Sequence, residues 1–404
     1  MKERLTDYSL RCNTSACRRV AMPMKQKMVM LTIVAVIVLQ MHGCEPASFV
    51  TVPESGLSGR MVFNAITGNG SNLGIIVLDL NLSGVVSGTV VHNGIEPRVS
   101  TNSLELVYTG TDSGKIDIMR SDIAGHNAID LTPDSTVIDS WPDWSPGDSS
   151  IVFSRVLPYP PFKEEVCVMH RDGTSLHKVS DTTQLQTATM PRWSPDGSTL
   201  AFVGDLFGGA SPDFSLYTIS PDGSHEILLD HVGGMLPASL PAWSPNSQRI
   251  AYGRTTQSAN MKKPGTPVDT SAGLLVIDLA TGISRKIYVP GVIVAGQGYS
   301  WLTNDDVICI GENPLDTAGG WSVYRISVST PTNWKLLARG FRPVPTAVSS
   351  PDGDYVAIVG TRDSSSAFAL FVVGSDGMGF RKLKDIAVDP EAFVNDWGDI
   401  EWVR

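Results

Sequence analysis

The sequence has few charged residues and no cluster of basic ones. Asp, Glu, Lys and Arg make up 18% of its 404 residues, and the formal net charge is -10. An acidic chain without a Lys/Arg patch is a poor candidate for nucleic-acid binding. Low charge combined with 38 glycines and 26 prolines favours many short strands joined by turns over long helices.

The motifs of common catalytic sites are also missing. The chain contains no Gly-x-Ser-x-Gly elbow, which excludes the usual nucleophile of propeller-linked serine hydrolases. It has no phosphate-binding loop, no His-Glu-x-x-His and no Asp-x-Asp-x-Asp-Gly calcium loop. We therefore predict no enzyme activity, no catalytic residue, no metal and no cofactor. Metal ligands contributed by separate repeats would escape such a search.

Cysteine is scarce and has no metal-binding spacing. None of the five cysteines forms a Cys-x-x-Cys pair. Cys167 and Cys309 lie in apolar runs, which is typical of small buried side chains. A disulfide between them is the alternative, but they fall in repeats that are not adjacent.

No apolar run is long enough to cross a bilayer, which needs about 20 residues. The longest, residues 28–41, follows Lys25 and Lys27 and is typical of a signal-peptide core. It ends at His42-Gly43-Cys44, which resembles a bacterial lipobox and implies lipidation at Cys44. A soluble export signal or an uncleaved anchor is the alternative, and the true start is Met1, Met22 or Met24. We expect a signal over 1–44 and a tether over 45–59.

One stretch, Pro191–Phe202, organises the remainder of the chain. Its Ser194-Pro195-Asp196-Gly197 has the chemistry of a type I turn, with Pro at the second position and Gly at the end. Trp193 precedes the turn, and Leu200 and Phe202 alternate after it. The pattern predicts a β-hairpin.

This hairpin recurs. Trp144, Trp193 and Trp243 are 49 and 50 residues apart, a period found in propeller blades. Weaker copies begin near residues 97, 300 and 348, and each unit offers further strands. We expect the repeat tryptophans, including Trp301, to be structural because they follow the period of the fold.

Four antiparallel strands per unit, repeated radially, predict an all-β β-propeller over residues 60–404. Six units have a recognisable first strand, and a seventh at the N-terminus lacks one. The isolated C-terminal segment 399–404 would supply it and close the ring. We predict seven blades, with six or eight as alternatives.

The Pro-x-Trp-Ser-Pro-Asp-Gly pattern, followed by alternating apolar residues and a second Asp-Gly, resembles the WD40-like (PD40) repeat of the TolB C-terminal β-propeller. The resemblance covers residues 60–404. It implies a propeller of an exported, envelope-associated protein. The domain and partner-binding segment that precede the propeller in TolB have no counterpart in 45–59, so a direct Tol–Pal role is not implied.

A candidate partner-binding ring lies where the first strands begin. Long irregular loops share that face, and binding residues often occupy such loops on a rigid scaffold. The predicted site residues are Glu96, Trp141, Met190, Leu240, Tyr299 and Thr346. Trp, Tyr and Met are enriched at binding interfaces. The alternative is that these side chains only pack between blades.

These observations predict a non-catalytic scaffold, exported and lipid-anchored to the bacterial envelope. It would bind a protein or peptide and act as a monomer, without nucleic acid. The alternative is a propeller that binds or cleaves carbohydrate, with Trp141 and Tyr299 stacking on sugar rings.

Overall fold

The computed structural model describes fourteen segments that together cover most of the chain after residue 57. They are residues 58–67, 72–80, 86–111, 114–158, 163–181, 183–206, 214–232, 240–254, 273–295, 298–314, 319–342, 345–362, 368–385 and 400–403. All belong to one compact unit, and every regular element in them is a β-strand. No helix among these residues could span a membrane. The predicted signal and Cys44 lie outside them.

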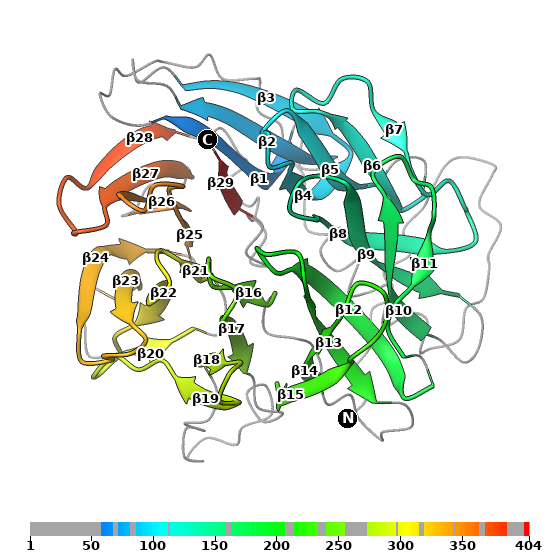
Figure 1. Cartoon of the computed structure of the whole chain (residues 1–404). Coiled ribbons are helices and arrows are strands. Elements are labelled where there is room, and N and C mark those ends of the chain that lie inside the picture. The colour runs from blue at the N-terminus through cyan, green and yellow to red at the C-terminus, as the bar shows by residue number, and fades with distance from the viewer. Residues whose placement is uncertain are drawn as a thin grey trace, which may run out of the picture. The chain divides into compact units, whose positions relative to one another are not determined.

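The strands form six sheets arranged as a β-propeller (Figure 1). Five sheets have four or five strands, and the sixth has eight. The first two contain β29 (Ile400–Val403), β1 (Gly59–Thr67), β2 (Asn72–Leu80) and β3 (Val86–His92), then β4 (Gly94–Val99), β5 (Glu105–Gly110), β6 (Asp117–Asp122) and β7 (Ile129–Asp130).

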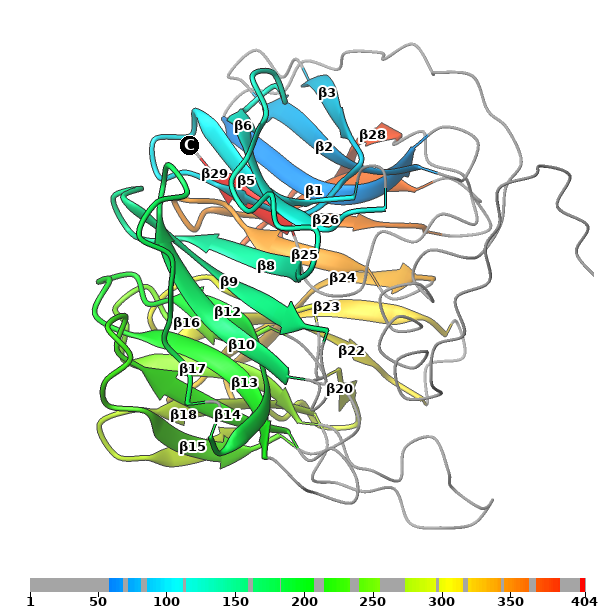
Figure 2. The same ribbon diagram turned by 90° about the vertical axis from the view of Figure 1, so that its right-hand side faces the viewer.

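The eight-stranded sheet follows in the chain. It contains β8 (Ile138–Trp144), β9 (Ser150–Leu157), β10 (Lys163–His170), β11 (His177–Lys178), β12 (Leu185–Trp193), β13 (Leu200–Leu206), β14 (Phe214–Ile219) and β15 (Ile227–His231). Figure 2 shows β8 and β9 of this sheet above β13 and β15.

Three smaller sheets complete the described part of the chain. The first of them contains β16 (Ala242–Trp243), β17 (Arg249–Arg254), β18 (Gly273–Asp278) and β19 (Ile283–Lys286). The next contains β20 (Ile293–Val294), β21 (Ser300–Trp301), β22 (Asp306–Glu312), β23 (Trp321–Ser327) and β24 (Trp334–Phe341). The last contains β25 (Thr346–Ser349), β26 (Tyr355–Gly360), β27 (Ala369–Gly374) and β28 (Arg381–Asp385).

The predicted hairpin turn has the expected geometry. The Gly197 N–H donates to the Ser194 carbonyl at 2.9 Å, and the Ser194 N–H donates to the Thr199 carbonyl at 2.8 Å. The Ser194 hydroxyl donates to Asp196 Oδ1 at 2.7 Å. Gly197 has a φ of 74°, which a residue without a Cβ adopts at little cost. The turn prediction is confirmed.

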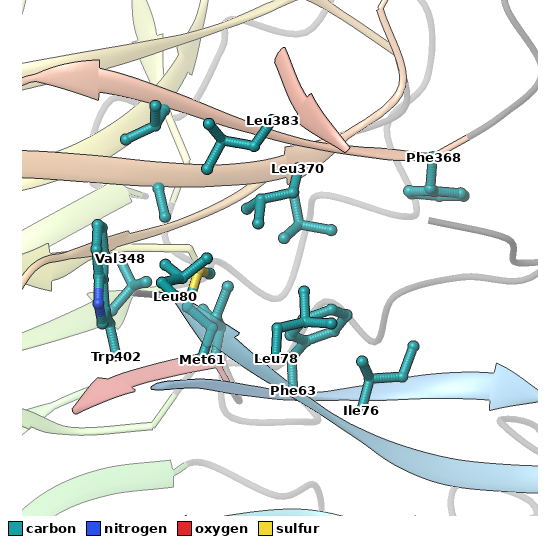
Figure 3. Packing of buried hydrophobic residues seen from close by; sticks show 14 residues of the cluster. Met61, Phe63, Ile76, Leu78, Leu80, Val348, Phe368, Leu370, Leu383 and Trp402 are labelled. Atoms are coloured by element: carbon teal, nitrogen blue, oxygen red, sulfur yellow. The ribbon is translucent and has the colours of Figure 1, made fainter. Parts of the chain in front are cut away.

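The hydrophobic core lies between sheets, because both faces of the inner strands are buried. Leu200 and Phe202 pack toward β9 and β10, whereas Ala201 and Val203 pack toward β17 and β18. Figure 3 shows another of these layers, in which Met61, Phe63 and Trp402 face Val348 and Leu370. Successive side chains of one strand point to opposite faces, so each strand packs against both neighbouring units.

The C-terminal strand completes the N-terminal sheet. β29 pairs antiparallel with β1, with Arg60 opposite Val403 and Phe63 opposite Ile400. The Trp402 indole N–H donates to the Ser58 carbonyl at 3.2 Å. The prediction that the isolated C-terminal segment supplies the missing first strand is confirmed.

Three of the four repeat tryptophans connect consecutive sheets through their indole N–H groups, whereas the buried indole nitrogen of Trp193 has no hydrogen-bond partner among the described residues. The indole N–H of Trp144 donates to the Arg98 carbonyl at 3.3 Å, that of Trp243 to the Arg192 carbonyl at 3.2 Å, and that of Trp301 to the Ala242 carbonyl at 2.9 Å. Each acceptor lies on the innermost strand of the preceding unit. These contacts support the structural role predicted for the tryptophans.

Cys167 and Cys309 are buried and free. The expectation of buried thiols is confirmed.

Candidate functional site

The six predicted binding residues lie on or just before the innermost strands. Three of them lie inside these strands, not at their beginning as predicted, and share an unusual backbone. Glu96, Trp141 and Met190 have φ values of 56°, 57° and 56°. Each lies at a register shift between the innermost strand and the next one. Such a β-bulge bends the strand and redirects the side chain and the N–H of the bulged residue.

The redirected N–H groups are held by the preceding unit. The Glu96 N–H donates to Asn64 Oδ1 at 2.9 Å, and the Met190 N–H donates to Ser154 Oγ at 3.1 Å. The Trp141 N–H donates to Glu96 Oε2 at 2.7 Å, and the same oxygen accepts the Thr109 hydroxyl at 2.6 Å. The bulges are therefore fixed in position by neighbouring strands.

The six predicted residues differ in exposure. The side chains of four are buried, with exposed fractions of 5–7% for Glu96, Met190, Leu240 and Thr346. Trp141 and Tyr299 are half-buried. The Tyr299 hydroxyl donates to the Leu240 carbonyl at 2.7 Å. Among the six, these two aromatic side chains present most surface to a partner, and binding by the ring stays a prediction.

A second group of residues was not anticipated from the sequence. Four charged residues of alternating sign occupy equivalent positions on consecutive innermost strands: Glu401, Arg98, Asp143 and Arg192. Arg98 Nε lies 3.4 Å from Glu401 Oε1 and 3.6 Å from Asp143 Oδ1. The only sequence signal is the residue between Pro and Trp in each Pro-x-Trp copy, and Glu401 lies far away in the chain.

Backbone groups complete this charged series. Glu401 Oε2 accepts the Val99 N–H at 2.8 Å, and Asp143 Oδ2 accepts the Trp193 N–H at 2.8 Å. Burial raises the pKa of both carboxyls, and the arginines oppose that rise. Because every charge in the series has an opposite neighbour, its role in the fold is to connect the inner strands of adjacent units.

Carboxylates also gather where β6, β7 and β8 meet. Asp139 is fully buried and forms a bidentate pair with Arg155, with N–O distances of 2.8 and 2.7 Å. Asp117 is 5% exposed, and burial raises the pKa of its carboxyl to about 6, with further contributions from Asp130 and Asp139.

A neighbouring carboxyl behaves similarly. Glu164 lies at the start of β10, where burial raises its pKa to about 7 against a hydrogen bond from Thr189. Burial thus shifts the pKa values of both Asp117 and Glu164 towards neutral pH.

Metal ligation finds no support among these groups. In the segments that the structure describes, no three His, Cys, Asp or Glu side chains are arranged to hold a metal ion.

The chain matches no known family model. Two curated proteins are similar to parts of it. An uncharacterized peptidase of Bacillus subtilis is 41% identical over 63 residues, which is 16% of this chain and 9% of that protein. Dipeptidyl-peptidase 5 of Porphyromonas endodontalis is 26% identical over 139 residues, 33% of this chain and 19% of that protein. The similarity thus spans less than a fifth of each relative.

Solved structures share the fold at low identity. The β-propeller domain of the Trilobed protease from Pyrococcus furiosus has a TM-score of 0.55 at 11% identity, covering 85% of this chain and all of that one. An oligogalacturonate lyase from Vibrio parahaemolyticus has a TM-score of 0.54 at 10% identity, with 82% and 88% covered. TolB from Acinetobacter baumannii has a TM-score of 0.48 at 14% identity, with 85% and 66% covered.

Proposed function

We propose that this chain is a non-catalytic propeller scaffold that binds a protein or peptide segment at the cell envelope. The observation that supports this most is Trp141. Its backbone is fixed by the Glu96 carboxylate, while its indole stays partly exposed. Aromatic side chains are frequent anchors of protein interfaces, and a fixed backbone lowers the conformational entropy that is lost when a partner packs on one.

We also propose that the propeller has seven blades. The eight-stranded sheet divides into two sets of four strands, β8–β11 and β12–β15, joined by a single parallel pair between Glu164 and Thr187. The buried hydrophobic clusters fall at seven junctions between such sets, the last of which returns to β1 and β29. Both observations support seven units.

The location at the envelope rests on the N-terminal sequence. The apolar run 28–41 and the lipobox-like His42-Gly43-Cys44 support export and lipidation at Cys44. The WD40-like repeats support a TolB-like origin of the propeller. Fractionation tests the anchor, since Cys44→Ser should release the protein from membranes if Cys44 carries the lipid.

Partner capture in the native cells tests the scaffold role. Crosslinking followed by mass spectrometry should recover one envelope protein with the wild-type chain. Trp141→Ala should reduce that recovery at least about tenfold, because it removes an interface anchor of about 2 kcal/mol or more. The matched control is Leu104→Ala, which removes a 61% exposed side chain from the turn between β4 and β5.

Folding must be verified for both variants by circular dichroism. Equal recovery with Trp141→Ala and the wild type would contradict the proposed surface. Recovery of no protein from cells would contradict the scaffold role itself.

The second candidate function is that of a propeller that accompanies a peptidase. It is favoured by the 41% identity over 63 residues with a protein named as a peptidase. A propeller that binds or cleaves carbohydrate is the remaining alternative, since Trp141 could stack on a sugar ring. Incubation of the purified chain with chromogenic dipeptides and with oligogalacturonate tests whether the chain itself is catalytic, and either activity would replace the scaffold proposal.

A further inference from the structure

Asp117 is a buried acid without the partner that buried acids normally have. It is the first residue of β6 and is 5% exposed. Its Oδ1 atom is fully buried and has no hydrogen-bond partner among the described residues. Buried side-chain oxygens nearly always have one, so an exception at this position calls for an explanation such as a ligand.

The backbone around Asp117 is fixed on two sides. The Ile118 N–H donates to Thr132 Oγ1 at 2.9 Å. The Asp139 N–H donates to the Ile116 carbonyl at 3.0 Å. These two bonds hold residues 116–118 between the segment after β7 and the first part of β8. Asp117 therefore lies at a junction between two units, and its position is set before any partner arrives.

The charges near Asp117 are mainly negative. The carboxyls that act on it are those of Asp130, Asp134 and Asp139, and the nearby cation is Lys115. Arg155 is engaged by Asp139 in a bidentate pair. Asp134 is exposed and accepts both the N–H and the hydroxyl of Thr136, at 2.9 and 2.7 Å. We call Asp117, Asp130 and Asp139 the Asp117 cluster, and the exposed Asp134 lies outside it.

The chemistry of this cluster selects its ligand. A carboxylate surplus attracts a cation, and the described residues offer no three side chains arranged for a metal ion. An ammonium or guanidinium group brings several N–H donors on one charge, which suits an unpartnered carboxylate oxygen. β8 also carries the half-buried Trp141, two residues after Asp139, so the same strand contributes to the cluster and to the proposed aromatic anchor.

We propose that the Asp117 cluster binds the ammonium or guanidinium group of a Lys or Arg side chain in the partner segment. This inference rests on the proposed function and specifies the charge of the partner. The Asp117 carboxylate accepts the hydrogen bonds, Asp130 and Asp139 add to the negative potential, and Trp141 packs against apolar parts of the same segment.

Binding should depend on pH. Burial, together with Asp130 and Asp139, raises the pKa of Asp117 to about 6, and Lys115 opposes this rise. The acid is therefore anionic at pH 7.5 and mainly neutral at pH 5. A neutral carboxyl attracts a cation weakly, so affinity for the cation should fall as the pH decreases through about 6.

Isothermal titration of the purified full chain with N-acetyl-trilysine amide tests the proposal. N-acetyl-trialanine amide is the uncharged control ligand. Asp117→Asn should weaken trilysine binding at least about tenfold at pH 7.5 and remove the loss of affinity between pH 7.5 and 5. Asp134→Asn removes the same charge from an exposed position nearby and should change affinity less than about threefold.

Three outcomes would overturn the inference: no binding of trilysine by the wild type, equal weakening by both variants, or an unchanged pH dependence in Asp117→Asn. Thermal unfolding of each variant verifies that it folds. These outcomes are separate from failure of the scaffold role. Capture of a partner that Asp117→Asn does not weaken would reject the cationic ligand alone, whereas capture of no protein would reject the scaffold.

Discussion

Arg155 supplies the positive charge that stabilises the buried carboxylate of Asp139. Both oxygens of the Asp139 carboxylate accept hydrogen bonds from its guanidinium. Burial nevertheless raises the pKa of Asp139 above its ordinary value, since desolvation outweighs the attraction. The pair is thus necessary because the acid is buried, and its net stabilising effect is small compared with the cost of losing one partner.

Arg155→Ala should lower the free energy of unfolding by about 3–5 kcal/mol at pH 7, because it leaves a buried carboxylate unpaired. The loss should be smaller at pH 4, where Asp139 keeps its proton in the folded variant. Urea unfolding at the two pH values measures both. Lys382→Ala is the control, since Lys382 pairs with Asp385 at the surface, with side chains 51% and 63% exposed. A similar loss in both variants would contradict this account.

At the scale of the element, β29 is held in place by its side chains as well as by its backbone pairing with β1. Trp402 is 6% exposed, packs in the layer with Met61 and Leu370, and donates its indole N–H to Ser58. On the same strand, Glu401 contacts Arg98 of the following sheet. The strand therefore connects three sheets, and without it β1 would expose an unpaired edge.

Trp402→Ala should destabilise the protein by about 3–5 kcal/mol, as removal of a large buried aromatic side chain does. It should also speed proteolysis near both chain ends. Urea unfolding and limited trypsin digestion measure these effects. Trp334→Ala on β24 is the matched control, because that side chain is 39% exposed. Equal stability of the two variants would contradict the view that β29 stabilises the propeller by closing the ring.

Local chemistry explains which elements could be predicted. The Ser194–Gly197 turn was predictable because Pro, Asp and Gly specify it within four residues. The pairing of β29 with β1 was predictable because the N-terminal unit lacked a first strand and the C-terminal segment belonged to no other unit. The bulge at Trp141 was not, because a positive φ before Pro142 has no local signal and depends on the Glu96 carboxylate from another sheet.

The candidate site was less predictable than the fold. Trp141 and Tyr299 were chosen from their place in the repeat, and both are half-buried. Asp117 and Asp139 gave no sequence motif, since their proximity arises from the contact between β6 and β8 of different units. Alternating burial along a strand can be read from a sequence, but pairing of charges between units requires the register of the ring.

At the scale of the whole molecule, each unit shares its core with both neighbours. Phe202 of β13 is fully buried, and its ring stacks on Tyr217 with the centroids 5.3 Å apart. Its layer includes residues of β9 and β10 from the preceding unit. A destabilising substitution in one layer should therefore lower the stability of the entire ring rather than unfold one sheet alone.

Phe202→Ala should lower the free energy of unfolding by about 3–5 kcal/mol while the transition stays single. Tryptophan fluorescence and far-ultraviolet circular dichroism should report the same midpoint. Leu104→Ala, at an exposed turn, should leave that midpoint within about 1 °C of the wild type. Two separated transitions in Phe202→Ala would indicate that the units unfold independently.

The pairing of β29 with β1 also sets an order of events during synthesis. The ribosome makes Gly59–Thr67 before Ile400–Val403, with an interval of roughly half a minute between them at about 10 residues per second. Throughout that time the nascent chain carries an incomplete first sheet with a free edge. We expect holdase chaperones to associate with this edge until Ile400–Val403 pairs with β1.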